Sequence, residues 1–306
     1  FLYGIMINLI NATTIGDPRL VILSVFSAIG VDLLALNLYG KYCKIDNKTL
    51  FFYGLFSLHP YFSVYALRFD TLDFATLACI LFLIILNSEM KTKTLILCLW
   101  ILVGLAMFRV SGLVFLLATL IGIYGIRCKL QITNFEKVNI FLILISSVLI
   151  IKQNGSLYLE GIQNASIIYG WNLQKTRILF GEFGYTFDVI IHYFYRIVTL
   201  FGAREAFYTE GYESIAFSRL GIMQLSSIPI LALFHLTSFV FFIRLAFRFG
   251  TMIPTMISMI TLVGALFTVG HMRYLLPYQP MILIGYLYLV ELNVFGKSSI
   301  NSSIST

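Results

Sequence analysis

Charged residues are scarce in this chain of 306 residues, at 11% where a soluble domain has about 25%. Hydrophobic residues make up 59% of the sequence, and the mean hydropathy is +0.91. A soluble protein this apolar could not cover its surface with polar groups, whereas in a bilayer the lipid takes the place of water. The shortage of charge therefore excludes a soluble domain and predicts an integral membrane protein.

Several sequence signatures are missing as well. The net charge is +7, but the basic residues are spread thinly between apolar runs, which excludes a nucleic-acid partner. The four cysteines are irregularly spaced and predict neither a disulfide framework nor a metal site. The sequence contains no Walker loop, dinucleotide fingerprint, nucleophile elbow or HExxH motif. The chain begins at Phe1 without the features of a signal peptide, so we expect the natural N-terminus to lie further upstream.

Apolar stretches long enough for membrane helices recur along the whole chain. The predicted fold class is all-α, a polytopic transmembrane helix bundle of about nine spans that forms a single membrane domain over residues 1–306. The stretch 95–126 would measure about 48 Å as one helix, too long for a hydrocarbon core of about 30 Å, so a turn at 108–112 is predicted to divide it. The other predicted spans are 20–39, 51–62, 72–86, 138–151, 220–242, 252–269 and 275–292.

The distribution of Lys and Arg predicts the orientation of these spans, because positive charge gathers on the cytoplasmic side. Residues 152–219 are predicted to form one long extracytoplasmic segment, and the Ser-rich tail 298–306 is predicted to be frayed. The segments predicted inside carry Lys41, Lys44, Lys48, Lys91, Lys93, Arg127, Lys129, Lys137, Arg244, Arg248 and Lys297, and the short outside turns hold only Arg19, Arg68, Arg109 and Arg273.

A different pattern lies within the extracytoplasmic segment, at residues 186–201. Asp188, His192 and Arg196 follow one another at intervals of four residues, on one face of a helix, and the other face is aromatic and aliphatic. This pattern predicts an interfacial amphipathic helix that lies on the membrane surface. If it crossed the membrane instead, Arg244 and Arg248 would move outside and break the charge rule.

The first cluster of candidate site residues surrounds a predicted helix break. Pro60 removes a backbone donor, and irregular backbone at membrane depth persists only where it lines a cavity or is buried in protein. His59, Arg68 and Asp70 then become candidates for substrate binding. The Asp70 carboxylate is suited to bind a divalent metal or to accept a proton from a sugar hydroxyl. A role as a helix cap explains an Asp at this position equally well. For Asp73 the cap is the favoured interpretation.

Two further outside turns carry cationic candidates. Arg273, with His271 beside it, can clamp a phosphate group because its guanidinium is planar and bidentate. The alternative is an interfacial anchor, which alone would be favoured. Arg109 is the third candidate, and its alternative is a side chain that extends from a turn to lipid headgroups. Asp32 lies within a predicted span and is expected to pair with another helix, while His235 is expected to be a packed interior residue.

Four segments, taken in their order along the chain, resemble the GT-C glycosyltransferases. Within this superfamily the resemblance is to the bacterial relatives of the protein O-mannosyltransferases and lipid A aminoarabinose transferases. The segments are FLYGIMINLINATTIGDPRLVILSVFSAIGVDLLALNLYGKY, HPYFSVYALRFDTLDFATL, GLAMFRVSGLVFLL and HMRYLLPYQPMILIGY. The third has Val110 where the family usually has Pro. The resemblance covers most of the chain except residues 152–219.

The resemblance implies an enzyme of the bacterial inner membrane. It would move a sugar, with inversion, from a polyprenyl-phosphate carrier to a lipid, glycan or protein acceptor on the extracytoplasmic side. The residues it implies for substrate binding are His59, Arg68, Asp70, Arg109, His271 and Arg273, with Asp70 also a possible position for a divalent metal. The catalytic base of the family is an Asp upstream of the segment that Phe1 begins, so no residue of this chain is matched to it.

Three other interpretations stay open. An O-antigen or exopolysaccharide polymerase would use arginines of a large outside segment to grip lipid pyrophosphate, and Lys175, Arg177, Arg196 and Arg204 suit that role. A lipid or sugar transporter or flippase should show internal repeats with paired broken helices, and the sequence shows none. A purely structural membrane subunit would not need a polar cavity on one face.

Overall fold

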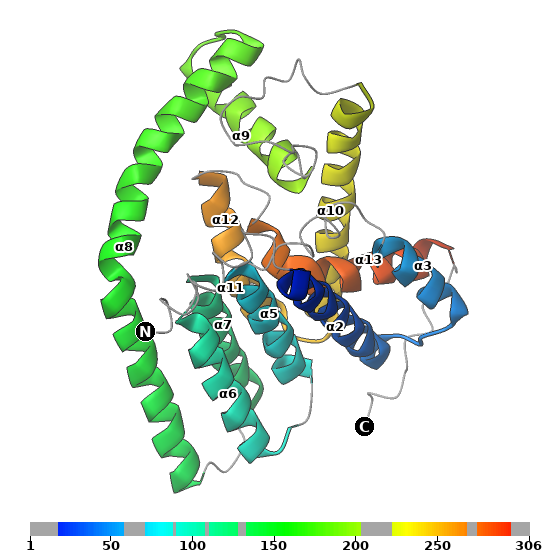
Figure 1. Ribbon diagram of the computed structural model, residues 1–306, viewed down its shortest axis with the longest axis vertical. Helices are drawn as coiled ribbons and strands as arrows, with labels where there is room; N and C mark the ends of the chain where they lie inside the picture. Colours follow the sequence, from blue (N-terminus) through cyan, green and yellow to red (C-terminus); the bar gives the residue numbers. More distant parts are fainter. Residues whose placement is uncertain are drawn as a thin grey trace. The chain divides into compact units, whose positions relative to one another are not determined.

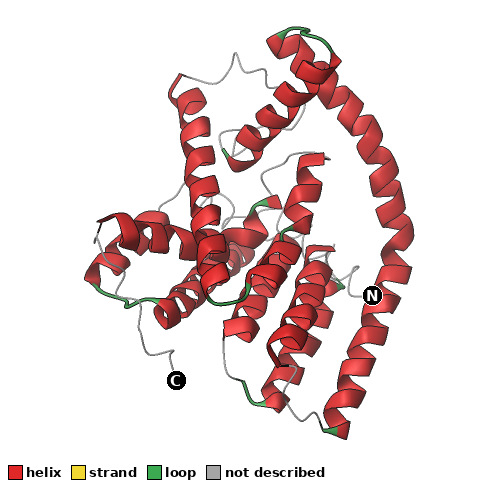
Figure 2. Cartoon of the chain, turned by 180° about the vertical axis from the view of Figure 1, so that it is seen from behind, coloured by secondary structure: helices red, strands yellow, loops and turns green. Residues whose placement is uncertain are grey.

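The computed structural model describes residues 18–57, 71–87, 90–107, 110–127, 133–202, 222–267 and 274–294. These residues form helices joined by short loops and contain no strand, as Figure 2 shows, which confirms the all-α prediction. The chain divides into two compact units. Unit 1 comprises Phe1–Ser146, Thr237–Ser258 and Leu276–Thr306, and unit 2 comprises Ser147–Leu236 and Met259–Leu275. That the chain forms a single membrane domain stays a prediction.

Most helices (Figure 1) cover nearly the same residues as the predicted spans. The helices that belong wholly to unit 1 are α2 (Pro18–Tyr42), α3 (Asn47–Ser57), α5 (Thr71–Asn87), α6 (Thr92–Ala106), α7 (Val110–Arg127), α11 (Met252–Ser258) and α13 (Gln279–Val294), with a short 3₁₀ turn, η4 (Leu276–Tyr278), before α13. The remaining described helices are α8 (Asn134–Phe180), α9 (Tyr185–Phe201), α10 (Ile222–Arg248) and α12 (Ile260–Phe267).

The predicted division of residues 95–126 is confirmed, because α6 ends at Ala106 and α7 begins at Val110. The two helices pack against each other, and Gly112 makes the close approach possible. A Cβ atom at Gly112 would lie 2.9 Å from the Leu105 carbonyl oxygen, so a larger residue would push the helices apart. The rings of Phe82 in α5 and Phe115 in α7 lie 5.8 Å apart, and Gly122 of α7 faces Leu86 of α5. These two contacts show that α5 and α7 run in the same direction.

The helix predicted at 51–62 begins earlier than expected, because α3 starts at Asn47. Asp46 caps it: its Oδ1 accepts hydrogen bonds from the backbone N–H and the hydroxyl of Thr49, each 2.8 Å long. These bonds lower the pKa of the Asp46 carboxyl from its ordinary value. Eleven residues measure about 16 Å as a helix, about half of a hydrocarbon core, and residues 58–62 lie outside the described residues.

The helix predicted at 138–151 is far longer than expected. α8 runs for 47 residues, from Asn134 to Phe180, about 70 Å. A capping box fixes its start: the Glu136 N–H donates to the Thr133 hydroxyl over 3.4 Å, and the Thr133 N–H donates to the Glu136 carboxylate over 2.9 Å. Lys152 ends the apolar run but carries no helix-breaking signal, so the helix continues into the predicted extracytoplasmic segment.

The span predicted at 252–269 is divided, and this corrects the sequence analysis. α11 ends at Ser258 and α12 begins at Ile260. The carbonyl oxygen of Ser258 accepts a 2.6 Å hydrogen bond from the Tyr278 hydroxyl. The N–H groups of Leu262 and Val263 both donate to Met259, over 3.0 and 3.1 Å. A distant side chain therefore uses an acceptor of the helix at the point where the helix breaks.

Two described helices are long and apolar enough to cross a membrane. They are Asn134–Gln153 within α8 and Pro229–Arg248 within α10, and only 17% and 39% of their most apolar windows are buried. The core helix of a soluble protein would be mostly buried. Large apolar side chains on α8, such as Phe141 and Val148, are instead exposed, as lipid-facing residues would be.

Gly285 lies where α13 meets the backbone of α10, which leads to a stability prediction. A Cβ atom at Gly285 would collide with the carbonyl oxygen of Ser238, a backbone atom that cannot rotate away. We expect Gly285→Ala to destabilise the protein by about 1–3 kcal/mol, because the two helices must separate. The measurement is thermal unfolding of the purified protein in detergent. Gly104→Ala is the matched control, since nothing lies within 4 Å of its Cβ position, and an equal loss in both variants would contradict the prediction.

Candidate functional site

The start of α13 is buried and closely packed within unit 1. Pro277 and Pro280 lie here, and the chain forms the 3₁₀ turn η4 before α13 begins at Gln279. Tyr278 is fully buried, with its hydroxyl on the Ser258 carbonyl and its ring 5.6 Å from Phe115 and 6.0 Å from Phe239. Residues of α7, α10 and α11 therefore hold the turn in place.

A buried polar pair joins α13 to α2 at this point. The Gln279 side-chain amide donates a 2.6 Å hydrogen bond to the Asp32 carboxylate, and both residues are 7% exposed. Sequence analysis expected Asp32 to pair with another helix, and this expectation is confirmed. It did not find Gln279, although a polar residue between two prolines at the start of an apolar helix was a signal for it.

A second contact between the same helices gives their relative direction. The Tyr39 hydroxyl donates to the Glu291 carboxylate over 2.7 Å, seven residues after Asp32 in α2 and twelve after Gln279 in α13. Both contacts advance from the N-terminal toward the C-terminal part of each helix. α2 and α13 therefore run in the same direction.

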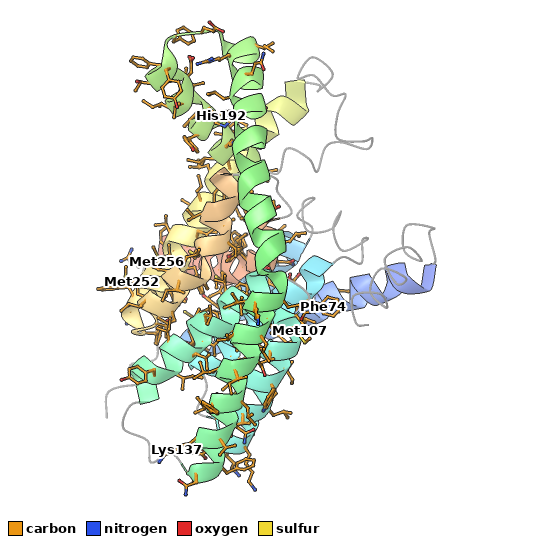
Figure 3. The ribbon with its side chains drawn as sticks, turned by 90° about the vertical axis from the view of Figure 1, so that its left-hand side faces the viewer. Phe74, Met107, Lys137, His192, Met252 and Met256 are labelled. Carbon is orange, nitrogen blue, oxygen red and sulfur yellow. The ribbon has the colours of Figure 1, made fainter. Side chains whose placement is uncertain are left out.

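The starts of α5, α7 and α13 lie at one end of unit 1, which we call the helix-start end. The Thr76 hydroxyl, in α5, donates to the Leu276 carbonyl in η4 over 3.4 Å, and Phe115 of α7 contacts Tyr278. In Figure 3, Phe74 near the start of α5 and Met107 just after α6 lie at the same end of unit 1, with Lys137 at the opposite end.

All six candidate site residues of the sequence analysis lie outside the described residues: His59, Arg68, Asp70, Arg109, His271 and Arg273. The elements that follow them along the chain are described. Asp70 directly precedes α5, Arg109 directly precedes α7, and Arg273 comes three residues before η4. No group of three or more His, Cys, Asp or Glu that could hold a metal lies within the described ranges, and Asp70 is outside them. The terminal tail 298–306 is also outside them.

The amphipathic helix predicted at 186–201 is confirmed as a helix, α9, in unit 2. Its polar residues are buried, with Asp188, His192 and Arg196 only 1–3% exposed, whereas Phe187 and Phe194 are 64% and 68% exposed. A helix on a water-facing surface exposes its polar face. α9 exposes its apolar face instead, as a helix in contact with lipid would. Burial, and secondarily the charge of Arg196, lowers the pKa of His192 to about 4, which keeps the imidazole neutral near pH 7.

Asp188 closes the turn between α8 and α9. Its carboxylate accepts a 2.7 Å bond from the Arg177 guanidinium and a 2.9 Å bond from the Phe183 N–H. The turn needs glycine at Gly181 and Gly184, where φ is +91° and +99°. In the same unit, His235 is fully buried with its Nδ1 against the Phe201 carbonyl, which confirms the packed interior histidine.

No family model, curated protein or solved structure matches the chain. The helix-start end of unit 1 is the candidate site, because three segments that carry the candidate residues lead into the helices that meet there.

Proposed function

We propose that this chain is a membrane glycosyltransferase that moves a sugar from a polyprenyl-phosphate carrier to an acceptor on the extracytoplasmic side. The observation that carries the proposal is the gathering of the starts of α5, α7 and α13 at one end of unit 1. Along the chain, Asp70 directly precedes α5 and Arg109 directly precedes α7, while Arg273 comes three residues before η4, the turn that leads into α13. A lipid phosphate and its acceptor would meet at such an end, where the helices leave the hydrocarbon core.

The proposed topology has nine spans in a bacterial inner membrane. Two spans that run in the same direction are separated by an odd number of other spans. Because α2 and α13 run in the same direction, the number of spans from α2 to α13, both included, must be odd, and nine meets this condition. Lys137 lies opposite the helix-start end, in agreement with a cytoplasmic position for the Lys-rich turns. The outward apolar face of α9 supports its placement on the membrane surface.

The proposed reaction is an inverting displacement. A base, which the family resemblance places upstream of Phe1, takes the proton of an acceptor hydroxyl, and the resulting oxygen attacks the anomeric carbon. The carrier phosphate leaves with the bonding electron pair. Arg273, with its two parallel donors, would stabilise the charge that develops on the phosphate oxygens.

The structure gives less support to a polymerase that grips lipid pyrophosphate through the outside segment. Arg177 donates to Asp188 over 2.7 Å, so this guanidinium already stabilises the turn between α8 and α9. Arg196 is only 3% exposed, and a residue that grips a lipid headgroup must be accessible to it. Lys175 and Arg204 are not described at the level of side chains.

Binding of polyprenyl phosphate by the purified protein in detergent tests the proposed function. We expect the protein to bind this lipid at least about tenfold more tightly than the uncharged polyprenol of the same length, since charged and bidentate hydrogen bonds recognise the phosphate. Equal affinity for the two lipids would overturn the proposal, because both share the same hydrocarbon chain.

The topology makes a separate prediction for two exposed polar positions. A cysteine at Glu182, in the turn between α8 and α9, should react with a membrane-impermeant reagent in intact cells, because residues 152–219 are proposed to face outward. The matched control is a cysteine at Asp46, which is also exposed but lies in a proposed inside turn. It should react only after the membrane is permeabilised. Both variants are made after the four native cysteines are replaced. The reverse pattern would contradict the nine-span topology.

A further inference from the structure

We propose that a basic surface of unit 1 binds the headgroups of anionic phospholipids. This inference goes beyond the proposed function and requires only that the chain lies in a membrane. Five exposed cationic side chains form the basic surface, and they come from the end of α2, the turn before α3, the start of α3 and the end of α10. They are Lys41, Lys44, Lys48, Arg244 and Arg248.

Electrostatics place the end of α10 beside the end of α2. Burial is the main cause that raises the pKa of the Cys43 thiol to about 12, and the charge of Arg248 acts in the opposite direction. The interaction between charges falls with distance, so the last residue of α10 lies near Cys43, which directly follows α2. Arg248 therefore adds its charge to those of Lys41 and Lys44.

The helix α13 supports α2 and α3 below the basic surface. Near the end of α2, the Tyr39 hydroxyl donates a 2.7 Å hydrogen bond to the Glu291 carboxylate of α13. Phe56 of α3 is buried, and its ring stacks on Tyr286 of α13 with the ring centroids 5.8 Å apart. The cationic side chains of α2 and α3 thus extend from helices that are packed against the same partner.

The basic surface keeps a net positive charge. Within residues 41–50 and 244–251, Asp46 is the only carboxylate, and its Oδ1 accepts the two hydrogen bonds of the Thr49 cap. The Glu291 carboxylate is buried and accepts from Tyr39. The exposed groups therefore favour an anionic partner.

Exposed apolar side chains next to the cations favour a phospholipid over a soluble anion. Phe51 is 62% exposed and comes three residues after Lys48, on the same face of α3. Phe247 is 71% exposed and comes three residues after Arg244 in α10. A phospholipid offers a phosphate beside acyl chains, which matches cations beside phenylalanines. In the proposed topology the basic surface faces the cytoplasmic leaflet, where anionic lipids gather.

The affinity of the purified protein for two phospholipids in a neutral detergent tests the proposal. At low salt, phosphatidylglycerol should bind at least about tenfold more tightly than phosphatidylcholine with the same acyl chains. About 1 M salt should remove most of this preference, because the Debye length falls to about 3 Å. Equal affinities at low salt would overturn the proposal. So would capture of polyglutamate by a protein that does not prefer phosphatidylglycerol, since the partner would then be an acidic protein.

A pair of double variants assigns the preference to this surface. Lys44→Gln with Arg248→Gln should weaken phosphatidylglycerol binding about tenfold and leave phosphatidylcholine binding unchanged. The matched control is Lys91→Gln with Lys93→Gln, which removes two exposed cations from another proposed inside turn. It should stay within about threefold of the wild type. Equal losses in the two double variants would overturn the proposal, because the total charge of the protein would then explain the preference.

Discussion

Arg273→Ala should nearly abolish binding of a polyprenyl-phosphate sugar by the purified protein, and Arg273→Lys should weaken it at least about tenfold. A guanidinium donates two parallel hydrogen bonds to a phosphate group, whereas an ammonium interacts with it as a point charge. The segment that carries Arg273 leads along the chain into η4, which the Tyr278 hydroxyl joins to Ser258, and then to Gln279, which hydrogen-bonds to Asp32.

The conservative variant decides between phosphate binding and membrane anchoring. A lysine reaches the lipid headgroups as well as an arginine does, so an anchoring residue would tolerate Arg273→Lys. Arg244→Lys is the matched control, because Arg244 is an exposed arginine near the end of α10 and is not placed in the site. Wild-type affinity in Arg273→Lys would leave only the anchoring role for Arg273.

Asp70→Asn should reduce sugar transfer about tenfold or more while the amount of folded protein stays the same. A tenfold loss corresponds to about 1.4 kcal/mol of transition-state stabilisation. The expected loss comes from the carboxylate charge, which can hold the acceptor or a divalent metal and which asparagine lacks. The measurement is the initial rate of transfer from a polyprenyl-phosphate sugar in reconstituted vesicles.

Asp73 provides the internal comparison for Asp70. It lies in the first turn of α5, three residues after Asp70, and its favoured role is to stabilise the start of that helix. Asp73→Asn should therefore change the transfer rate much less than Asp70→Asn does. Small and equal effects in the two variants would assign Asp70 to the helix cap and remove it from the site.

The parts of the fold that sequence analysis predicted depend on local signals. The hydropathy of the chain indicated the helical class, and the excessive length of the stretch 95–126 indicated a turn, which the structure places between Ala106 and Val110. The four-residue spacing of Asp188, His192 and Arg196 likewise predicted α9. Each of these signals lies within a window of a few helical turns, so one sequence is enough to detect it.

The parts that it missed depend on contacts between distant residues. Residues 252–269 look like one apolar helix, and the break at Met259 coincides with the bond that the Ser258 carbonyl accepts from Tyr278. α8 passes Lys152 because a change in polarity does not by itself end a helix. For the candidate site, the sequence supplied the residue types and their order, while the partner of Asp32 required the arrangement of α2 against α13.

The distance along the chain between Asp32 and Gln279 has a consequence for biogenesis. The two residues are 247 positions apart, and at a synthesis rate of about 5–20 residues per second, Gln279 is made about 12–50 seconds after Asp32. In the proposed topology, α2 reaches the insertion machinery long before its partner exists. During this interval a charged Asp32 carboxylate within the hydrocarbon core would lack its Gln279 partner, which is costly. The Asp32–Gln279 hydrogen bond therefore forms only after α13 has been released from the ribosome.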